Sequence, residues 1–109
     1  MSDMNAYQEA TKSTAIYPPE SALAYLVLGL TSEAGEVAGK LKKLIRDPDA
    51  MPIEEWRKIV ISEMGDVLWY IARLADELEI PLSEVALENL NKLSSRKERG
   101  KLGGSGDNR

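Results

Sequence analysis

The stretch "SALAYLVLGLTSEAGEVAGKLKKLI", residues 21–45, decides the fold. Its apolar residues recur at intervals of three and four, which is the spacing of one face of an amphipathic α-helix. The heptapeptide "RDPDAMP", residues 46–52, follows it and ends the helix, because proline cannot continue it. The sequence therefore predicts one long helix whose apolar stripe consists of Leu23, Leu26, Val27, Leu30, Ala34, Val37, Leu41, Leu44 and Ile45.

Three further helices are predicted from the same spacing. A short helix at residues 7–14 is ended by "YPPE", residues 17–20, and the fourth covers residues 82–95 with Ser83 as its candidate N-cap. Nothing alternates with period two, so the fold class is all-α, a four-helix bundle in residues 1–96. The tail, residues 97–109, is rich in glycine and charge and is not expected to fold alone. The third helix carries the apolar set Trp56, Val60, Met64, Val67, Leu68, Ile71, Leu74 and Leu78.

Composition excludes several classes of function. The 109 residues include no cysteine and no histidine, so thiol chemistry and histidine acid-base or metal chemistry are impossible, and carboxylates are the remaining candidates. A net charge of −4 argues against nucleic acid as a partner, because phosphate backbones bind clustered cations. No apolar run is long enough for a membrane span, and the N-terminus lacks the features of a signal peptide. We expect a cytoplasmic protein with no membrane contact.

An acidic hexapeptide occurs twice, as "SEAGEV" at residues 32–37 and as "SEMGDV" at residues 62–67. At 100° per residue, Glu33 falls at the edge of its apolar stripe, and Glu63 falls deeper, among aromatic and aliphatic residues. Glu36 and Asp66 each follow by one turn, so each motif places two acids about 5–6 Å apart at the Cβ atoms. Like charges beside an inward-facing stripe are unfavourable and need compensation.

A hard divalent cation, Mg²⁺ or Mn²⁺, is the simplest compensation, because it takes oxygen ligands and several carboxylates can share it. The alternative is a solvated acidic face, which is common on helices. Two copies on consecutive helices favour the metal site. Four helical glycines, which each destabilise a helix by about 1 kcal/mol relative to alanine, suggest close helix approach or room for a ligand. These are Gly29, Gly35, Gly39 and Gly65.

The segments "GLTSEAGEVAGKLKK" and "ISEMGDVLWYIARL" resemble the paired ExxE and ExxD motifs of the MazG-like, all-α nucleoside triphosphate pyrophosphohydrolases. The resemblance extends from "YQEAT" to "GSGDNR" and implies a MazG-like helical domain over residues 1–96. It implies that Mg²⁺ is bound by Glu33, Glu36, Glu63 and Asp66. The segment "ENLNKLSSRKERG" is similar to the family's Asn, Lys and Arg signature, carried over here as Asn89, Lys92 and Arg96. Without the resemblance, these three would form an ordinary polar helix face.

The implied reaction is hydrolysis of a (deoxy)nucleoside triphosphate to the monophosphate and pyrophosphate, in nucleotide-pool house-cleaning. A water molecule attacks the α-phosphorus, and Glu33 or Glu36 is the candidate to orient it. Lys40 and Lys43 share the Glu36 side of their helix and are candidate phosphate ligands. Trp69 or Tyr70 could stack on the base, although aromatic residues on a helical stripe usually belong to the core.

Two other classes were considered. A ferritin-like di-iron bundle normally uses Glu-x-x-His pairs, which a chain without histidine cannot supply. A non-catalytic oligomeric helical interaction module would have its acidic pairs solvated or paired with lysines. For the enzyme and for the interaction module alike, we expect a homodimer or homotetramer, because apolar residues lie off the main stripes and one small chain cannot cover them. The residues concerned are Tyr25, Leu28, Ile61 and Ala72.

Overall fold

The computed structural model describes residues 3–109, and in these residues it contains four α-helices and no strand. The prediction of an all-α fold is confirmed. The elements, in chain order, are α1 (Met4–Ala10), η1 (Thr11–Thr14), η2 (Pro19–Ser21), α2 (Ala22–Arg46), α3 (Ile53–Glu77) and α4 (Leu82–Glu98), where η denotes a short 3₁₀ helix.

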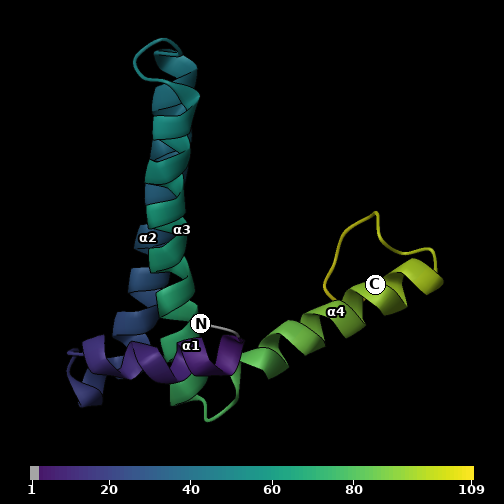
Figure 1. The fold of residues 1–109 in the computed structure, drawn as a ribbon. Helices are drawn as coiled ribbons and strands as arrows, with labels where there is room; N and C mark the ends of the chain where they lie inside the picture. Colours follow the sequence, from purple (N-terminus) through teal and green to yellow (C-terminus); the bar gives the residue numbers. More distant parts are fainter. Residues whose placement is uncertain (1–2) are drawn as a thin grey trace.

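Helices α2 and α3 form a long antiparallel hairpin (Figure 1). Each has 25 residues, which corresponds to a length of about 37 Å. The predicted ends of α2 are confirmed to within a residue, and its Leu26 is fully buried. Helix α3 begins at Ile53, because the carbonyl group of Pro52 accepts hydrogen bonds from the backbone N–H groups of Glu55 and Trp56. The hairpin is therefore the rigid element on which both acidic motifs lie.

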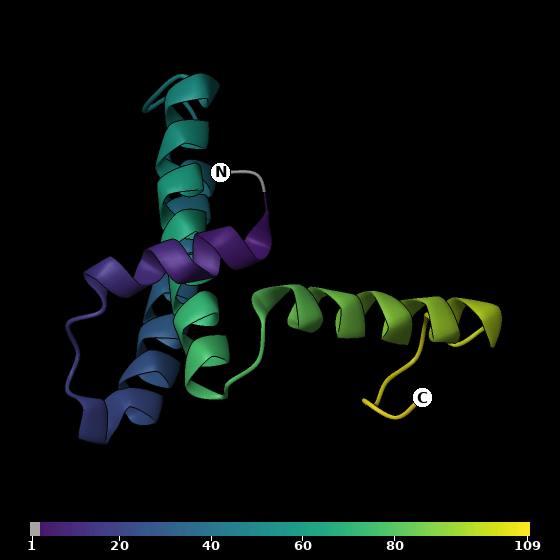
Figure 2. The same ribbon diagram turned by 60° about the horizontal axis from the view of Figure 1, so that its bottom comes forward.

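Helix α1 crosses the open end of the hairpin (Figure 2). It begins at Met4, earlier than predicted, because the Asp3 carboxylate accepts a hydrogen bond from the backbone N–H of Ala6 at 2.7 Å. It ends at Ala10, and residues 11–14, predicted as α-helix, form a 3₁₀ turn instead. The small core lies at this crossing and comprises Ala72, Ala75 and Leu82, with Tyr7, Ile71 and Ile80 packed against it.

Side chains of α1 supply the N-terminal cap of α4. The Gln8 side chain accepts from the backbone N–H of Leu82 at 2.8 Å and donates to the carbonyl of Ile80 at 2.9 Å. Asn5 accepts from the backbone N–H of Ser83 at 3.0 Å. The prediction that Ser83 is the N-cap was wrong: Pro81 occupies that position, and the partners of the free N–H groups come from 74 to 78 residues earlier in the chain. These bonds fix the direction in which α4 leaves the core.

Helix α4 projects away from the hairpin, so the four helices do not form a closed bundle within one chain (Figure 1). The accessible surface is 7922 Å², against about 6,000 Å² expected for a compact 12.0 kDa protein. The radius of gyration is 16.9 Å, against about 13 Å expected. Of the residues predicted to lie off the main stripes, Leu28 is 70% exposed and Ile61 is 62% exposed, but Ala72 is fully buried in the core.

The tail folds back along α4 (Figure 1). The Arg109 guanidinium donates hydrogen bonds to the carbonyl groups of Lys101, Leu102, Gly103 and Gly106. Gly100, Gly104 and Gly106 have positive φ angles, which the turns of this loop require. Among the residues that the structure describes, no helix has the length and apolar character needed to cross a membrane.

Candidate metal and nucleotide site

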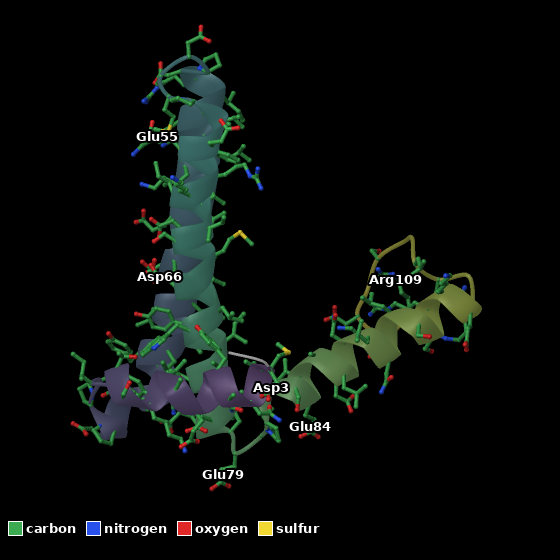
Figure 3. All side chains as sticks on the ribbon, viewed as in Figure 1. Asp3, Glu55, Asp66, Glu79, Glu84 and Arg109 are labelled. Carbon is green, nitrogen blue, oxygen red and sulfur yellow. The ribbon has the colours of Figure 1, made fainter. Side chains whose placement is uncertain are left out.

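Three carboxylates meet on the hairpin. Oxygen atoms of Glu33 on α2 and of Glu63 and Asp66 on α3 all lie within 4.8 Å of one another. Glu63 and Asp66 are three residues apart and so share one face of α3, and the antiparallel pairing brings Glu33 against that face. Figure 3 shows Asp66 about midway along the hairpin, on the side away from α4. The repeated hexapeptide thus builds one acidic cluster from two helices.

The cluster is electrostatically strained in the absence of a cation. Burial raises the pKa of Glu33 above its ordinary value, and the negative charges of Asp66, Glu63 and Glu36 raise it further. Glu33 and Glu63 are both half-buried, although the sequence pattern placed Glu63 deeper. None of the ion pairs found in residues 3–109 involves these carboxylates. Within the described part of the chain, no ion pair therefore offsets the charge of these carboxylates.

Glu36 is exposed and lies outside the group of three. It follows Glu33 by three residues on α2, so it remains close enough for its charge to raise the pKa of Glu33. The structure therefore brings together three of the four predicted metal ligands and leaves the fourth beside them. The donor set consists of carboxylate oxygens alone, which fits a hard cation such as Mg²⁺ or Mn²⁺ and does not fit a soft transition metal.

Trp69 and Tyr70 belong to a closed ring of four aromatic side chains that includes Tyr17 and Tyr25. Trp69 and Tyr70 are edge to face, with ring centroids 5.0 Å apart, and Tyr25 lies 6.2 Å from Tyr70. Tyr17 stacks on Tyr25 at 5.3 Å and meets Trp69 edge-on at 6.3 Å. Tyr70 follows Asp66 by four residues, so this group of four aromatic side chains begins about one helical turn from the acidic cluster.

The two predicted base-stacking residues differ in their surroundings. The indole N–H of Trp69 donates to the Thr14 hydroxyl at 2.8 Å, which ties Trp69 to the 3₁₀ turn. Burial raises the pKa of Tyr70, with further contributions from Tyr25, Glu33 and Asp66, so its hydroxyl group stays protonated at neutral pH. The charges of the acidic cluster therefore act on Tyr70, and the charge of Asp66 also raises the pKa of Tyr7, after the larger effect of burial.

Lys40 and Lys43 lie towards the turn of the hairpin. Together with Arg46 they contribute to the lining of a pocket that also includes Trp56, whose indole N–H donates to the carbonyl of Lys40 at 3.3 Å. Lys40 and Lys43 follow Glu36 by four and seven residues, about 6 and 10 Å along the helix axis. Extended lysine side chains can span much of that distance, so both remain candidate phosphate ligands.

The sequence comparisons agree with this geometry. A family model described as the MazG nucleotide pyrophosphohydrolase domain matches residues 21–100, which include α2, α3 and α4. The chain belongs to the MazG family. The Gene 37 protein of Mycobacterium phage L5 is similar to it, with 48% identity over 112 residues that cover 97% of this chain and 98% of that protein. No solved structure matches the chain significantly.

The candidate Asn and Lys side chains of α4 do not lie at the acidic cluster in this chain. Asn89 and Lys92 are exposed on α4 and line a groove with Glu84 and Glu88. Figure 3 shows Asp66 and α4 on opposite sides of the hairpin. Within this chain, Asn89 and Lys92 are therefore held away from the acidic cluster.

Arg96 has a different environment. It is only 7% exposed, and its guanidinium donates to the carbonyl of Asp107 in the tail at 2.6 Å. In this structure Arg96 therefore anchors the tail to α4. The same tail carries the "GSGDNR" sequence, residues 104–109, whose terminal Arg109 holds the loop together.

Sequence reasoning missed Arg73 on α3. This side chain is buried, donates to the Thr11 hydroxyl at 3.1 Å and to the Tyr17 hydroxyl at 3.4 Å, and forms an ion pair with Asp76. Arg73 thereby ties the segment before α2 to α3 and holds Tyr17 within the group of four aromatic side chains. The only available signal was the spacing of Arg73 and Asp76 by three residues, which also occurs on solvated helices.

Proposed function

We propose that this protein hydrolyses nucleoside triphosphates at the α-phosphorus and releases the monophosphate and pyrophosphate. The observation that carries the proposal is the convergence of Glu33, Glu63 and Asp66 from two antiparallel helices in a MazG-family chain. Deoxynucleotides and ribonucleotides are both candidate substrates, and removal of unwanted nucleotides from the pool is the expected role.

The roles of the residues follow from their positions. Glu33, Glu63 and Asp66 would hold Mg²⁺, for which Mn²⁺ could substitute. When bound, the ion supplies positive charge that offsets the charge of the triphosphate and of the cluster. Glu36 lies beside the cluster without belonging to it, so we assign it to orient the attacking water and to accept its proton. A new bond forms from the water oxygen to the α-phosphorus, and the bond from the α-phosphorus to the bridging oxygen breaks.

The remaining contacts concern the phosphates and the nucleoside. We assign Lys40 and Lys43, four and seven residues after Glu36 on α2, to bind the β- and γ-phosphates, which would leave as pyrophosphate. We assign Tyr70, one turn from Asp66, to contact the sugar or base, and Trp69 packs edge to face against it. Arg96 is engaged by the tail, so we assign it the role of tail anchor and keep Asn89 and Lys92 as candidate phosphate ligands.

We further propose that the active form is a homodimer or homotetramer. The surface of one chain exceeds that of a compact chain by about 2,000 Å², so a dimer that covered this excess would bury about 4,000 Å² in total, within the range of obligate homodimers. An apolar groove of about 530 Å³ runs along the hairpin and is lined by Ala34, Val37, Met64, Gly65, Val67, Leu68 and Ile71. A second copy of the hairpin would cover it. Assembly would also let α4 of one chain bring Asn89 and Lys92 to the cluster of another.

The reaction is tested by product analysis over a panel of ribo- and deoxynucleoside triphosphates with Mg²⁺ in ¹⁸O-labelled water. Attack at the α-phosphorus places the label in the monophosphate. Label in pyrophosphate would indicate attack at the β-phosphorus, and diphosphate with inorganic phosphate would indicate attack at the γ-phosphorus; either would refute the proposal. The same analysis is repeated on Glu63→Gln, which should lose activity. Its matched control is Glu55→Gln, because Glu55 is exposed on the same helix but near the hairpin turn (Figure 3).

Assembly is tested by light scattering over a range of protein concentrations. A monomer at every concentration would contradict the proposed assembly. Inactivity towards every triphosphate in the panel, in a protein that is folded and oligomeric, would instead favour the helical interaction module.

A further inference from the structure

One glycine of the hairpin is in contact with an aromatic ring. A Cβ atom built on Gly29 of α2 would lie 2.0 Å from Cε1, 2.4 Å from Cζ and 2.6 Å from Cδ1 of Tyr70 on α3. The other hairpin glycines differ, since a Cβ atom on Gly35, Gly39 or Gly65 would meet nothing within 4 Å in this chain. Gly29 is therefore the position at which the absence of a side chain allows a neighbouring ring to approach the helix backbone.

The contact lies directly beside the acidic cluster. Gly29 precedes Glu33 by four residues on α2, and Tyr70 follows Asp66 by four residues on α3. Both partners of the contact are thus about one turn, or about 6 Å along the helix axis, from the carboxylates on their own helices. The Tyr70 ring is held on its other sides by Trp69, 5.0 Å away between centroids, and by Tyr25, 6.2 Å away.

We propose that Gly29 is a positioning residue for substrate selection. By letting the Tyr70 ring lie deep between α2 and α3, it sets the size of the subsite that receives the sugar and base of the nucleotide. This inference rests on the proposed function. The α-phosphate is joined directly to the sugar, so a nucleotide whose phosphates are held at the cluster must place its nucleoside within about one helical turn of it, where Tyr70 lies.

The effect on substrate should be separable from an effect on folding. A Cβ atom at position 29 would lie 2.0–2.6 Å from three atoms of the Tyr70 ring, so the ring must shift although it is packed against Trp69 and Tyr25. Gly29→Ala should therefore displace the Tyr70 ring and lower the melting temperature. Because that loss of stability does not act on phosphate binding in the folded protein, tripolyphosphate binding separates it from an effect on the nucleoside.

The experiment compares the parent with Gly29→Ala, Tyr70→Leu and the double variant. Gly39→Ala is the matched control, because it makes the same change on the same helix where no neighbour is met. For each protein we would measure kcat and KM for a nucleoside triphosphate. We would also measure the inhibition constant of inorganic tripolyphosphate, which carries the phosphates that the cluster is proposed to hold but no nucleoside. Light scattering and thermal unfolding check assembly and folding.

We expect Gly29→Ala to raise KM about tenfold, the typical effect of losing one aromatic contact to a base, with a much smaller change in kcat. The inhibition constant of tripolyphosphate should not change. Tyr70→Leu should raise KM similarly, and Ala at position 29 should add nothing in the Tyr70→Leu background, because the ring it displaces is absent.

Three results would overturn the inference in an active parent. They are an unchanged KM in Gly29→Ala, an equal loss of tripolyphosphate binding, and additive effects in the double variant. Should Gly29→Ala fail to fold, Tyr70→Leu alone decides, since an unchanged KM in that variant would show that the ring does not face the nucleoside. An inactive parent would refute the proposed function itself, which is a distinguishable outcome.

Discussion

Replacing Glu63 by glutamine removes one negative charge from the acidic cluster with almost no change in shape. Two unit charges 4.8 Å apart repel by about 1 kcal/mol in a water-like dielectric and by about 3 kcal/mol at an effective dielectric constant of 20. Glu33 and Glu63 are half-buried and Asp66 is exposed, so the lower figure applies. Glu63 has two such neighbours, so Glu63→Gln should stabilise the metal-free protein by about 1–2 kcal/mol.

The assay is thermal unfolding followed by far-ultraviolet circular dichroism, in EDTA and in excess Mg²⁺. In EDTA, Glu63→Gln should melt about 4–8 °C above the parent for each kcal/mol gained. In Mg²⁺ the order should reverse, because an ion at 100 times its dissociation constant stabilises the parent by about 2.7 kcal/mol and the variant has lost a ligand. Catalytic activity should fall by orders of magnitude.

The control is Glu55→Gln, which removes a charge from the same helix away from the cluster. It should leave the melting temperature nearly unchanged and the response to Mg²⁺ equal to that of the parent. The reasoning would be refuted if Glu63→Gln kept full activity and the parent's response to Mg²⁺. The carboxylates would then be a solvated face, and the enzyme proposal would have to be withdrawn with the metal site.

Three other predictions concern single side chains. The pKa of Glu33 is raised, so between the ordinary glutamate pKa and the raised one the folded metal-free protein holds a proton that the unfolded chain releases. The free energy of unfolding should therefore fall as the pH rises through this range, and Glu33→Gln should lack this fall when its stability is measured against pH. Gln8→Ala should lower the free energy of unfolding in urea by about 1–3 kcal/mol, because it leaves the N–H of Leu82 and the carbonyl of Ile80 unpaired, whereas Gln8→Glu should retain part of the cap; a loss below about 0.5 kcal/mol would contradict this. Arg73→Met should destabilise by about 2–4 kcal/mol and alter Trp69 fluorescence, and an unchanged emission spectrum would show that Arg73 does not hold the aromatic side chains in place.

Much of the fold could be predicted because its signals are local. Three-and-four spacing defined the faces of α2 and α3, and prolines marked their ends. The start of α1 was missed although its signal is also local, an aspartate that caps the N–H three residues later. The cap of α4 could not have been predicted, because its acceptors come from Asn5 and Gln8, more than 70 residues away in sequence.

The features of the site also divide into those that local sequence signals predict and those that they do not. The pairing of Glu33 with Glu63 and Asp66 follows from two copies of one motif on helices that a short turn forces to be antiparallel. The exclusion of Glu36 from the group of three could not be predicted from the motif, because Glu33 and Glu36 have the same three-residue spacing as Glu63 and Asp66, which both belong to the group. The contact of Gly29 with Tyr70 depends on the depth at which a ring packs, which spacing alone does not specify.

The position of α4 shows which candidate site residues one chain does not bring together. Periodicity identifies an apolar face but not the surface that covers it, and α4 leaves the core in a direction set by two side chains of α1. The acidic cluster is complete within one hairpin, whereas Asn89 and Lys92 are held away from it. If those side chains serve the substrate, then metal binding is a property of one chain and nucleotide binding is a property of the assembly. The acidic motif and the Asn and Lys motif would then be coupled through the interface that covers the exposed apolar face of the hairpin.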